Sequence, residues 1–366
     1  MREPRVSARS ARGARSALVD PADPAAPAVR ARTSSTARRG GALLVLLGLL
    51  VAALALSLAV GSRPVDLGTV WGALTGQDVP PADRAAVVGL RLPRTVLAVL
   101  VGAGLAVAGG LMQALTRNPL ADPGILGVTS GAAFAVAMGV VLLGVTRPSG
   151  YVWFAFGGAL LATLAVYLVG SAGRSNAGPV QLTLAGVALS AVLTGVVGAL
   201  RLTDQERFAV LLTWESGSFQ ARGWGVILPV LPFVLLGLAV AGVVAGALNT
   251  LGLGEDLATA LGASVGRTRV LAVVAITLLA GGATAMAGPI TLVGLMVPHI
   301  VRWSVGPDQR WVLGLSAVAG PVLVLLADVA ARVLLWPGEL PVGVVTAFVG
   351  APVLIALVRR RTATGL

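Results

Sequence analysis

Few side chains in this sequence could carry out chemistry, and most of them are arginines. The chain has one histidine, His299, and no cysteine, so zinc, iron–sulfur and disulfide frameworks lack their usual ligands. All 27 basic residues are arginines. Without lysine the chain can hold neither a Walker A loop nor a Schiff-base lysine. Any ATP hydrolysis that drives this protein must therefore come from another chain.

Two further charged residues stand in an apolar context. Asp328 and Arg332 are four residues apart, which places them on one helix face, where an ion pair would offset the burial of both charges. A proton relay through Asp328 or Asp122 is the alternative interpretation. For His299 we expect a packed position near a helix end, because one histidine does not make a metal site.

Membrane helices must position these residues. The sequence is 56% hydrophobic and 11% charged, far below the roughly 25% charged residues of a soluble domain. A helix that crosses a bilayer needs about 20 apolar residues. Ten stretches approach that length and predict an all-α integral membrane protein: residues 42–60, 94–115, 123–143, 152–170, 181–200, 226–248, 268–287, 290–304, 310–333 and 341–358.

Prolines and glycines interrupt the apolar pattern. Pro119 ends the helix before it, and Asp122 followed by Pro123 is a typical helix start. Gly288-Pro289 and Pro298 divide a later stretch into short helices. Membranes tolerate broken helices only inside protein or beside an aqueous cavity.

Two connecting segments are also distinctive. Between the sixth and seventh spans, the pattern indicates a short amphipathic helix from Glu255 to Leu261, stopped by Gly262. Trp214 and Trp224 flank a polar segment, a position typical of interface anchors. Anchoring does not explain the Gly217-Ser218 pair between them.

The net charge of +12 sits mainly in two tails. Residues 1–40 hold nine arginines against three acids, and Arg359, Arg360 and Arg361 lie near the other end. The composition of residues 1–40 predicts a disordered tail without aromatic residues for stacking on nucleic acid. Arginine-rich flanks stay in the cytoplasm. We therefore expect cytoplasmic tails at residues 1–40 and 359–366 around a ten-helix domain of residues 41–358.

A twin-arginine signal is an alternative interpretation of Arg38-Arg39 before the first apolar run. That run is about 20 residues long, longer than the apolar core of a signal peptide, so a retained helix is favoured.

The loops of the ten-helix domain reverse the usual charge bias. The outer side holds nine arginines: Arg63, Arg84, Arg91, Arg94, Arg147, Arg201, Arg207, Arg222 and Arg332. The positive-inside rule does not explain this outward excess. These arginines therefore need a function of their own.

A series of motifs runs in order along residues 42–358. They are Arg91-Leu92-Pro93-Arg94, Gly102-Ala103-Gly104, Met112-Gln113, Arg117-Asn118-Pro119-Leu120-Ala121-Asp122-Pro123, Trp214 with Gly217-Ser218, Gly254-Glu255 with Leu261-Gly262, Gly288-Pro289-Ile290, Val297-Pro298-His299, Ala327-Asp328 with Arg332, and Glu339-Leu340-Pro341-Val342-Gly343. Together they resemble the FecCD family, the permease subunits of importers for iron–siderophore, haem and cobalamin.

The resemblance implies a ten-helix permease similar to type II ABC importers, with short broken helices and a pair of cytoplasmic coupling helices. It implies a second permease subunit, identical or related, two ABC ATPase subunits that bind ATP and magnesium, and an extracytoplasmic substrate-binding protein. The chain itself would hold no cofactor and catalyse no reaction. It would lie in the cytoplasmic (inner) membrane with both termini inside.

The resemblance also assigns residues. Arginines matching Arg91, Arg94 and Arg332 pair with acidic residues of the binding protein. The ATPase-coupling segment supplies five matching positions: Gly254, Glu255, Ala258, Leu261 and Gly262. Asn118 and Leu120 match a cytoplasmic gate, whose other element would fall at residues 177–180.

We therefore expect the permease subunit of an ATP-driven importer of a ferric siderophore. Cobalamin or haem carried by the same machinery is the first alternative. An ion-coupled secondary transporter is the second, and it needs a titrating carboxylate such as Asp328. A non-transporting membrane anchor or an intramembrane enzyme is the third, and for the enzyme no Ser–His–Asp pattern is visible.

Overall fold

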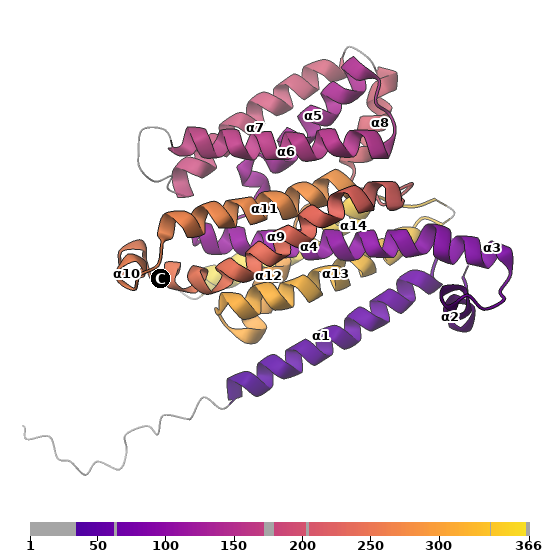
Figure 1. The fold of residues 1–366 in the computed structure, drawn as a ribbon, viewed down its shortest axis with the longest axis horizontal. Helices are drawn as coiled ribbons and strands as arrows, with labels where there is room; N and C mark the ends of the chain where they lie inside the picture. The colour runs from indigo at the N-terminus through magenta and orange to yellow at the C-terminus, as the bar shows by residue number, and fades with distance from the viewer. Residues whose placement is uncertain (1–33, 62–63, 172–178, 203–204, 337, 364–366) are drawn as a thin grey trace, which may run out of the picture.

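A computed structural model describes residues 34–61, 64–171, 179–202, 205–336 and 338–363, and the regular structure in these ranges is helical (Figure 1). The elements are α1 (Ser34–Ala59), α2 (Leu67–Thr75), α3 (Pro81–Arg84), η1 (Ala85–Arg91), α4 (Leu92–Thr116), η2 (Pro123–Leu126), α5 (Val128–Leu143), α6 (Pro148–Ser171), α7 (Pro179–Arg201), α8 (Gln205–Glu215), α9 (Trp224–Leu251), α10 (Glu255–Ala260), α11 (Val265–Ala287), α12 (Val293–Val305), α13 (Gln309–Val333) and α14 (Val342–Ala363). Most of the predicted tail 1–40, the last residues of the tail 359–366 and the first half of the second gate element at 177–180 lie outside the described residues.

Each predicted span overlaps one of these helices. Within the described ranges, seven helices are long and apolar enough to cross a membrane: Ala37–Ala59, Pro81–Thr116, Pro148–Gly170, Val180–Arg201, Trp224–Leu251, Val265–Ala287 and Gln309–Val333. Shorter apolar helices cover the remaining spans: Val128–Leu143, Val293–Val305 and Val342–Ala356. The all-α membrane architecture is confirmed, while the number of crossings stays a prediction.

Helix α4 runs through the centre of the molecule, packed against α9, α11, α12 and α13. In the most apolar window of its helix, 83% of the residues are buried. A Cβ at Gly102 would collide with the backbone of Gly320 on α13, and one at Gly109 would collide with Gly294 on α12. Small residues therefore allow the close approach of the central helices.

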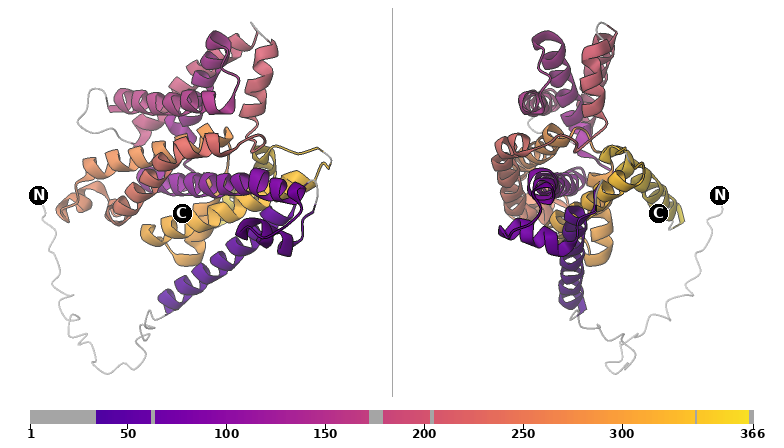
Figure 2. Two further views of the ribbon diagram at one scale, coloured as in Figure 1. Left: turned by 45° about the vertical axis from the view of Figure 1, so that its right-hand side comes forward. Right: turned by 90° about the vertical axis from the view of Figure 1, so that its right-hand side faces the viewer.

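Helices α1 and α7 lie at the periphery. The buried share of the apolar window is 11% in α1 and 17% in α7. Figures 1 and 2 show α1 as a diagonal at one edge, and α7 grouped with α5, α6 and α8 at the other. The apolar outer faces of both helices suit contact with lipid rather than water.

The central helix begins earlier than the sequence predicts. It runs back from α4 through η1, a π-helix, to Pro81, whereas the apolar pattern starts near residue 94. Pro93 lacks the N–H that an α-helix needs, and a π-helical turn before it accommodates the disturbed hydrogen-bond pattern. The extension places Arg91 and Arg94 on one continuous helix.

Two ends of the bundle matter for function. The α3 end, with α2 and α8, contains the start of α4 and the end of α13; the α10 end contains the end of α4 and the start of α13 (Figure 1). In the predicted topology the α3 end faces outward and the α10 end faces the cytoplasm.

Candidate functional site

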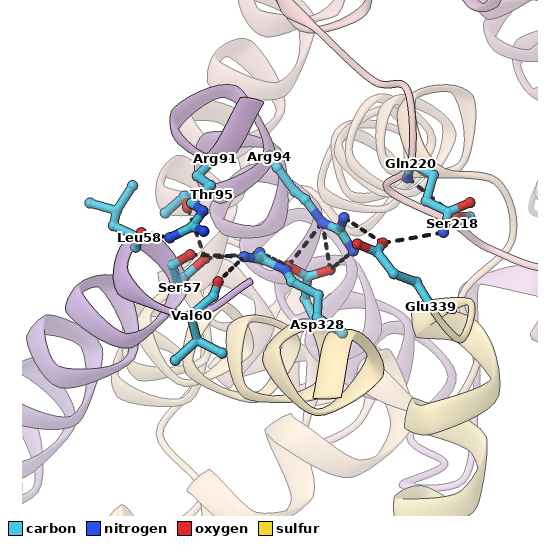
Figure 3. A network of polar contacts seen from close by, with 11 residues as sticks. Ser57, Leu58, Val60, Arg91, Arg94, Thr95, Ser218, Gln220, Asp328 and Glu339 are labelled. Atoms are coloured by element: carbon cyan, nitrogen blue, oxygen red, sulfur yellow. Dashed lines mark hydrogen bonds and ion pairs between the residues drawn. The ribbon is translucent and has the colours of Figure 1, made fainter. Parts of the chain in front are cut away.

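The three arginines predicted to dock a binding protein meet at the α3 end. Arg91 is the last residue of η1, Arg94 lies in the first turn of α4, and Arg332 lies in the last turn of α13. Figure 3 shows Arg91 and Arg94 in one polar network between helices. Their role in docking stays a prediction.

Asp328 is the centre of this network and is fully buried. Arg94 donates from Nη2 to Asp328 Oδ1 at 2.8 Å and from Nε to the same oxygen at 3.0 Å. Arg332 donates to Asp328 Oδ2. The predicted Asp328–Arg332 pair is confirmed, and Arg94 joins it from another helix. Because two guanidinium groups hold this carboxylate, a proton relay would require it to leave both of them.

The network also fastens the end of α1. Arg91 donates to the carbonyls of Leu58 and Ala59 at 2.8 Å each, and Arg332 donates to the carbonyl of Ser57 at 2.8 Å. The last carbonyls of a helix lack intrahelical partners and carry partial negative charge. Cations at this position stabilise the helix end, so these arginines have a structural role whatever else they bind.

Glu339 closes the network on its exposed side. Arg94 Nη1 donates to Glu339 Oε2 at 2.7 Å, and Gln220 Nε2 donates to the same oxygen at 3.2 Å. Partial burial raises the pKa of Glu339, but the hydrogen bond and charge of Arg94 outweigh it and hold this pKa below its ordinary value of 4.5. Glu339 is therefore ionised at neutral pH.

A pocket of about 570 Å³ opens beside the network. Its wall includes Arg91, Arg94, Arg222 and Arg332, with Glu339 as a carboxylate among them. Such a cationic surface at the rim of a molecule attracts and orients an acidic partner.

Arg222 is a pocket residue to which the sequence assigned an outward position but no partner. Its side chain is 6% exposed. It donates to the Tyr151 hydroxyl, and its guanidinium carbon lies 5.1 Å from the centre of the Tyr151 ring. Burial lowers the pKa of Arg222, and the contact with Tyr151 partly opposes that effect. No local sequence pattern predicts this contact, because Arg222 and Tyr151 are 71 residues apart in the chain.

The interpretation of Trp214 as an interface anchor is wrong. Its side chain is fully buried, whereas that of Trp224 is 39% exposed. Next to Trp214, the carbonyl of Gly217 accepts a hydrogen bond from Gly343 N at 2.9 Å. Gly217 has φ of 69°, and a Cβ there would collide with the carbonyl of Pro289. The loops at Gly217 and Pro289 and the first turn of α14 meet too closely for a side chain, which explains the glycine.

The predicted coupling segment forms a short helix between two glycine turns at the α10 end. The helix α10 follows Gly254, whose φ is 115°, and precedes Gly262, whose φ is 80°. Both values lie in the left-handed region that favours glycine. A helix thus stands on each side of the Gly262 turn, α10 before it and α11 after it.

The two faces of the coupling segment differ. Ala258 is fully buried, while Leu257 and Leu261 are 48% and 60% exposed. Arg269 Nη2 donates to Glu255 Oε1 at 2.6 Å and so ties α10 to α11. An exposed apolar surface on a braced helix is suited to contact with another protein.

The predicted gate residues lie in the loop that follows α4, also at the α10 end. Asn118 Oδ1 accepts a hydrogen bond from Leu120 N at 3.0 Å, which forms an Asx turn. The Leu120 side chain is 38% exposed. Asp122 caps η2 by accepting from Gly124 N at 2.8 Å, so the predicted helix start is confirmed. The gating role of Asn118 and Leu120 stays a prediction.

Two polar side chains fix α12 in place. Gln113 Nε2 on α4 donates to the carbonyl of Leu295 at 3.0 Å, and Arg302 donates to Gln113 Oε1 at 3.2 Å. His299 is buried and meets the Trp303 ring edge-on at 4.9 Å between centroids. The packed position expected for His299 is confirmed, although it lies inside α12 rather than near its end.

These features define a multi-pass helical membrane protein with a charged network at one end and a braced short helix at the other. Residues 49–360 match the FecCD transport family, and the chain belongs to that family. Its members are permease subunits of ABC transporters and are not themselves enzymes.

Several known permeases are similar over nearly their whole length. The chain is 48% identical over 320 residues to the ferric enterobactin transport system permease protein FepD of Escherichia coli (strain K12), covering 87% of this chain and 95% of that protein. Identity is 42% over 322 residues with the vitamin B12 import system permease protein BtuC of Yersinia enterocolitica, covering 85% and 91%. It is 36% over 330 residues with the hemin transport system permease protein HmuU of Yersinia pestis, covering 88% and 95%.

A solved structure has the same fold. The chain is similar to a metal-chelate type ABC transporter in an inward-facing conformation, with a TM-score of 0.78 and 29% sequence identity. The match covers 88% of this chain and 99% of that chain.

Proposed function

We propose that this chain forms the membrane pathway of an ATP-driven importer that carries a ferric siderophore into the cell. The observation that most supports this substrate is the 48% identity to a ferric enterobactin permease over 95% of that protein. The vitamin B12 and hemin permeases, at 42% and 36%, leave cobalamin and haem as alternatives.

In this proposal the chain works with other subunits. A second permease, identical or related, completes the pathway, two ATPase subunits bind at the α10 end, and a substrate-binding protein docks at the α3 end. Both termini lie in the cytoplasm. The absence of lysine supports a separate ATPase, because no P-loop can form in this chain. ATP binding would then shift the pathway between outward and inward access.

Arg91, Arg94 and Arg332 form the docking surface in this proposal. They line the pocket of about 570 Å³, and an acidic side chain entering it would compete with Glu339 for Arg94. The test is the affinity of the substrate-loaded binding protein for the reconstituted importer. Arg91→Gln should weaken docking several-fold, while Arg147→Gln, an exposed arginine at the same end outside the pocket, should not. If the binding protein has the same affinity for both variants and for the unmodified importer, this assignment is contradicted.

The coupling surface in this proposal consists of Gly254, Glu255, Ala258, Leu261 and Gly262. The buried Ala258 and the Glu255–Arg269 ion pair would transmit ATPase movement to α9 and α11, since α10 packs on both helices. Asn118 and Leu120 lie at the same end and would narrow the pathway on the cytoplasmic side.

Substrate choice is tested by transport itself. Vesicles that contain this chain with its ATPase and binding protein should accumulate an iron-labelled siderophore when ATP is supplied on the side of the membrane that the ATPase subunits face. Unlabelled siderophore should abolish the signal, whereas cobalamin and haem should leave it unchanged. Competition by cobalamin or haem, and not by siderophore, would assign the chain to one of the two alternatives.

The ion-coupled alternative has little structural support. Its required carboxylate, Asp328, is fully buried and is held by Arg94 and Arg332. Uptake by the chain without ATPase subunits, driven by a proton gradient, would favour that alternative.

A further inference from the structure

A groove between α1, α12 and α13 combines an apolar wall with a cationic end. Its volume is about 680 Å³, and aliphatic side chains dominate its lining. Residues at its apolar end include Leu46 on α1, Met296 on α12 and Leu323 on α13. Arg38 lies at its other end.

The polar end continues into a second cavity of about 750 Å³ at the α10 end of the bundle. Arg38 lines both cavities, and Arg39 lines the second. Arg39 lies 3.8 Å from Asp308 and 5.5 Å from the centre of the Trp311 ring. Among the residues that the structure describes, Arg38 has no carboxylate partner, so its charge is available to a ligand.

The groove changes from polar to apolar along its length, as a bilayer leaflet does. Arg38, Ser304 and Trp303 lie at one end, and the Trp303 side chain is 54% exposed. Tryptophan and arginine are typical of the headgroup level of a membrane, where aromatic rings and cations contact polar lipid groups. The neighbouring α1 has the highest mean hydropathy among the seven long apolar helices, 2.8. Only 11% of the residues in its apolar window are buried. The groove is therefore continuous with a surface that faces lipid.

We propose that this groove binds an anionic phospholipid, with its phosphate between Arg38 and Arg39 and an acyl chain along α1, α12 and α13. Cationic pockets between membrane helices at headgroup level select anionic lipids. The cationic end of the groove lies at the α10 end of the bundle, whereas the docking arginines lie at the α3 end. The proposal does not depend on the identity of the transported substrate.

Lipid binding to the purified full chain tests the proposal by native mass spectrometry, with phosphatidylglycerol and phosphatidylcholine as probes. One arginine near a headgroup contributes about fivefold to anionic-lipid affinity. Arg38→Gln should therefore weaken phosphatidylglycerol binding about fivefold, and the Arg38→Gln/Arg39→Gln pair should remove the preference over phosphatidylcholine. Arg267→Gln is the matched control, because Arg267 is an exposed arginine at the same end and outside both cavities.

Two further variants test the parts of the site separately. Asp308→Asn should strengthen phosphatidylglycerol binding, because it releases Arg39 from its carboxylate while an asparagine can still cap α13. Gly41→Leu should weaken binding of both lipids, because Gly41 lines the groove and a Cβ there meets open space. Equal affinity for both lipids in the unmodified chain, or unchanged phosphatidylglycerol binding in Arg38→Gln, would overturn the proposal. Lipid binding unaffected by Gly41→Leu would overturn the groove as the place of the acyl chain.

Discussion

Replacing Asp328 with alanine should destabilise the protein by about 3–5 kcal/mol, the range for removing one partner of a buried ion pair. Asp328 is fully buried and accepts hydrogen bonds from Arg94 and Arg332. Its loss leaves two guanidinium groups facing each other, and the Arg332 side chain is only 3% exposed. The upper part of the range is therefore expected.

The assay is reversible unfolding of the purified chain in mixed micelles, titrated with a denaturing detergent. Glu339→Gln provides the matched control, since Glu339 also pairs with Arg94 but its side chain is 24% exposed. An ion pair of that exposure contributes about 1 kcal/mol or less. The two variants thus remove a carboxylate from the same arginine at different depths.

A double replacement separates pairing from packing. Combining Asp328→Leu with Arg94→Leu removes opposite charges together. The double variant should therefore lose less free energy of unfolding than the two single variants lose in sum. A cost below about 1 kcal/mol for Asp328→Ala, or an equal cost for Glu339→Gln, would refute the reasoning that burial makes this carboxylate indispensable.

Three further outcomes follow from the structure. Gly109→Val should destabilise the fold by about 3 kcal/mol or more, because its side chain would strike the Gly294 backbone, and the same unfolding assay measures it. The pKa of Glu339 is lowered in the folded protein, so the stabilisation that its carboxylate provides is present above about pH 4.5 and is lost as the pH falls through the lowered pKa. The difference in free energy of unfolding between the unmodified protein and Glu339→Gln should therefore shrink over that acidic interval. Leu261→Arg should abolish ATP-dependent uptake without changing thermal stability, because Leu261 is 60% exposed on the coupling segment; uptake at the unmodified rate would remove Leu261 from the coupling surface.

Local sequence signals predicted the local features correctly. The spacing of Asp328 and Arg332 is that of one helix face, and the structure pairs them. The turn from Asp122 to Pro123 and the helix before Gly262 rest on capping and backbone preferences of a few adjacent residues, and both are present.

Features that depend on which helices become neighbours escaped prediction. Arg94 reaches Asp328 across 234 residues, and no periodicity in either helix indicates that contact. Trp214 is buried where two loops and the start of α14 converge beside it, whereas its sequence surroundings resemble a membrane interface. The predicted start of the central helix is too late because Arg91, Pro93 and Arg94 interrupt the apolar run, whereas the helix continues through them from Pro81.

The most direct measurement is iron-siderophore uptake by sealed vesicles that contain this chain, its ATPase subunits and a loaded binding protein. ATP should drive accumulation of the intact ferric siderophore, and omission of the ATPase should abolish it even under an imposed proton gradient. Accumulation without ATPase subunits, or no accumulation of any ferric siderophore while cobalamin or haem is taken up, would contradict a siderophore permease driven by a separate ATPase.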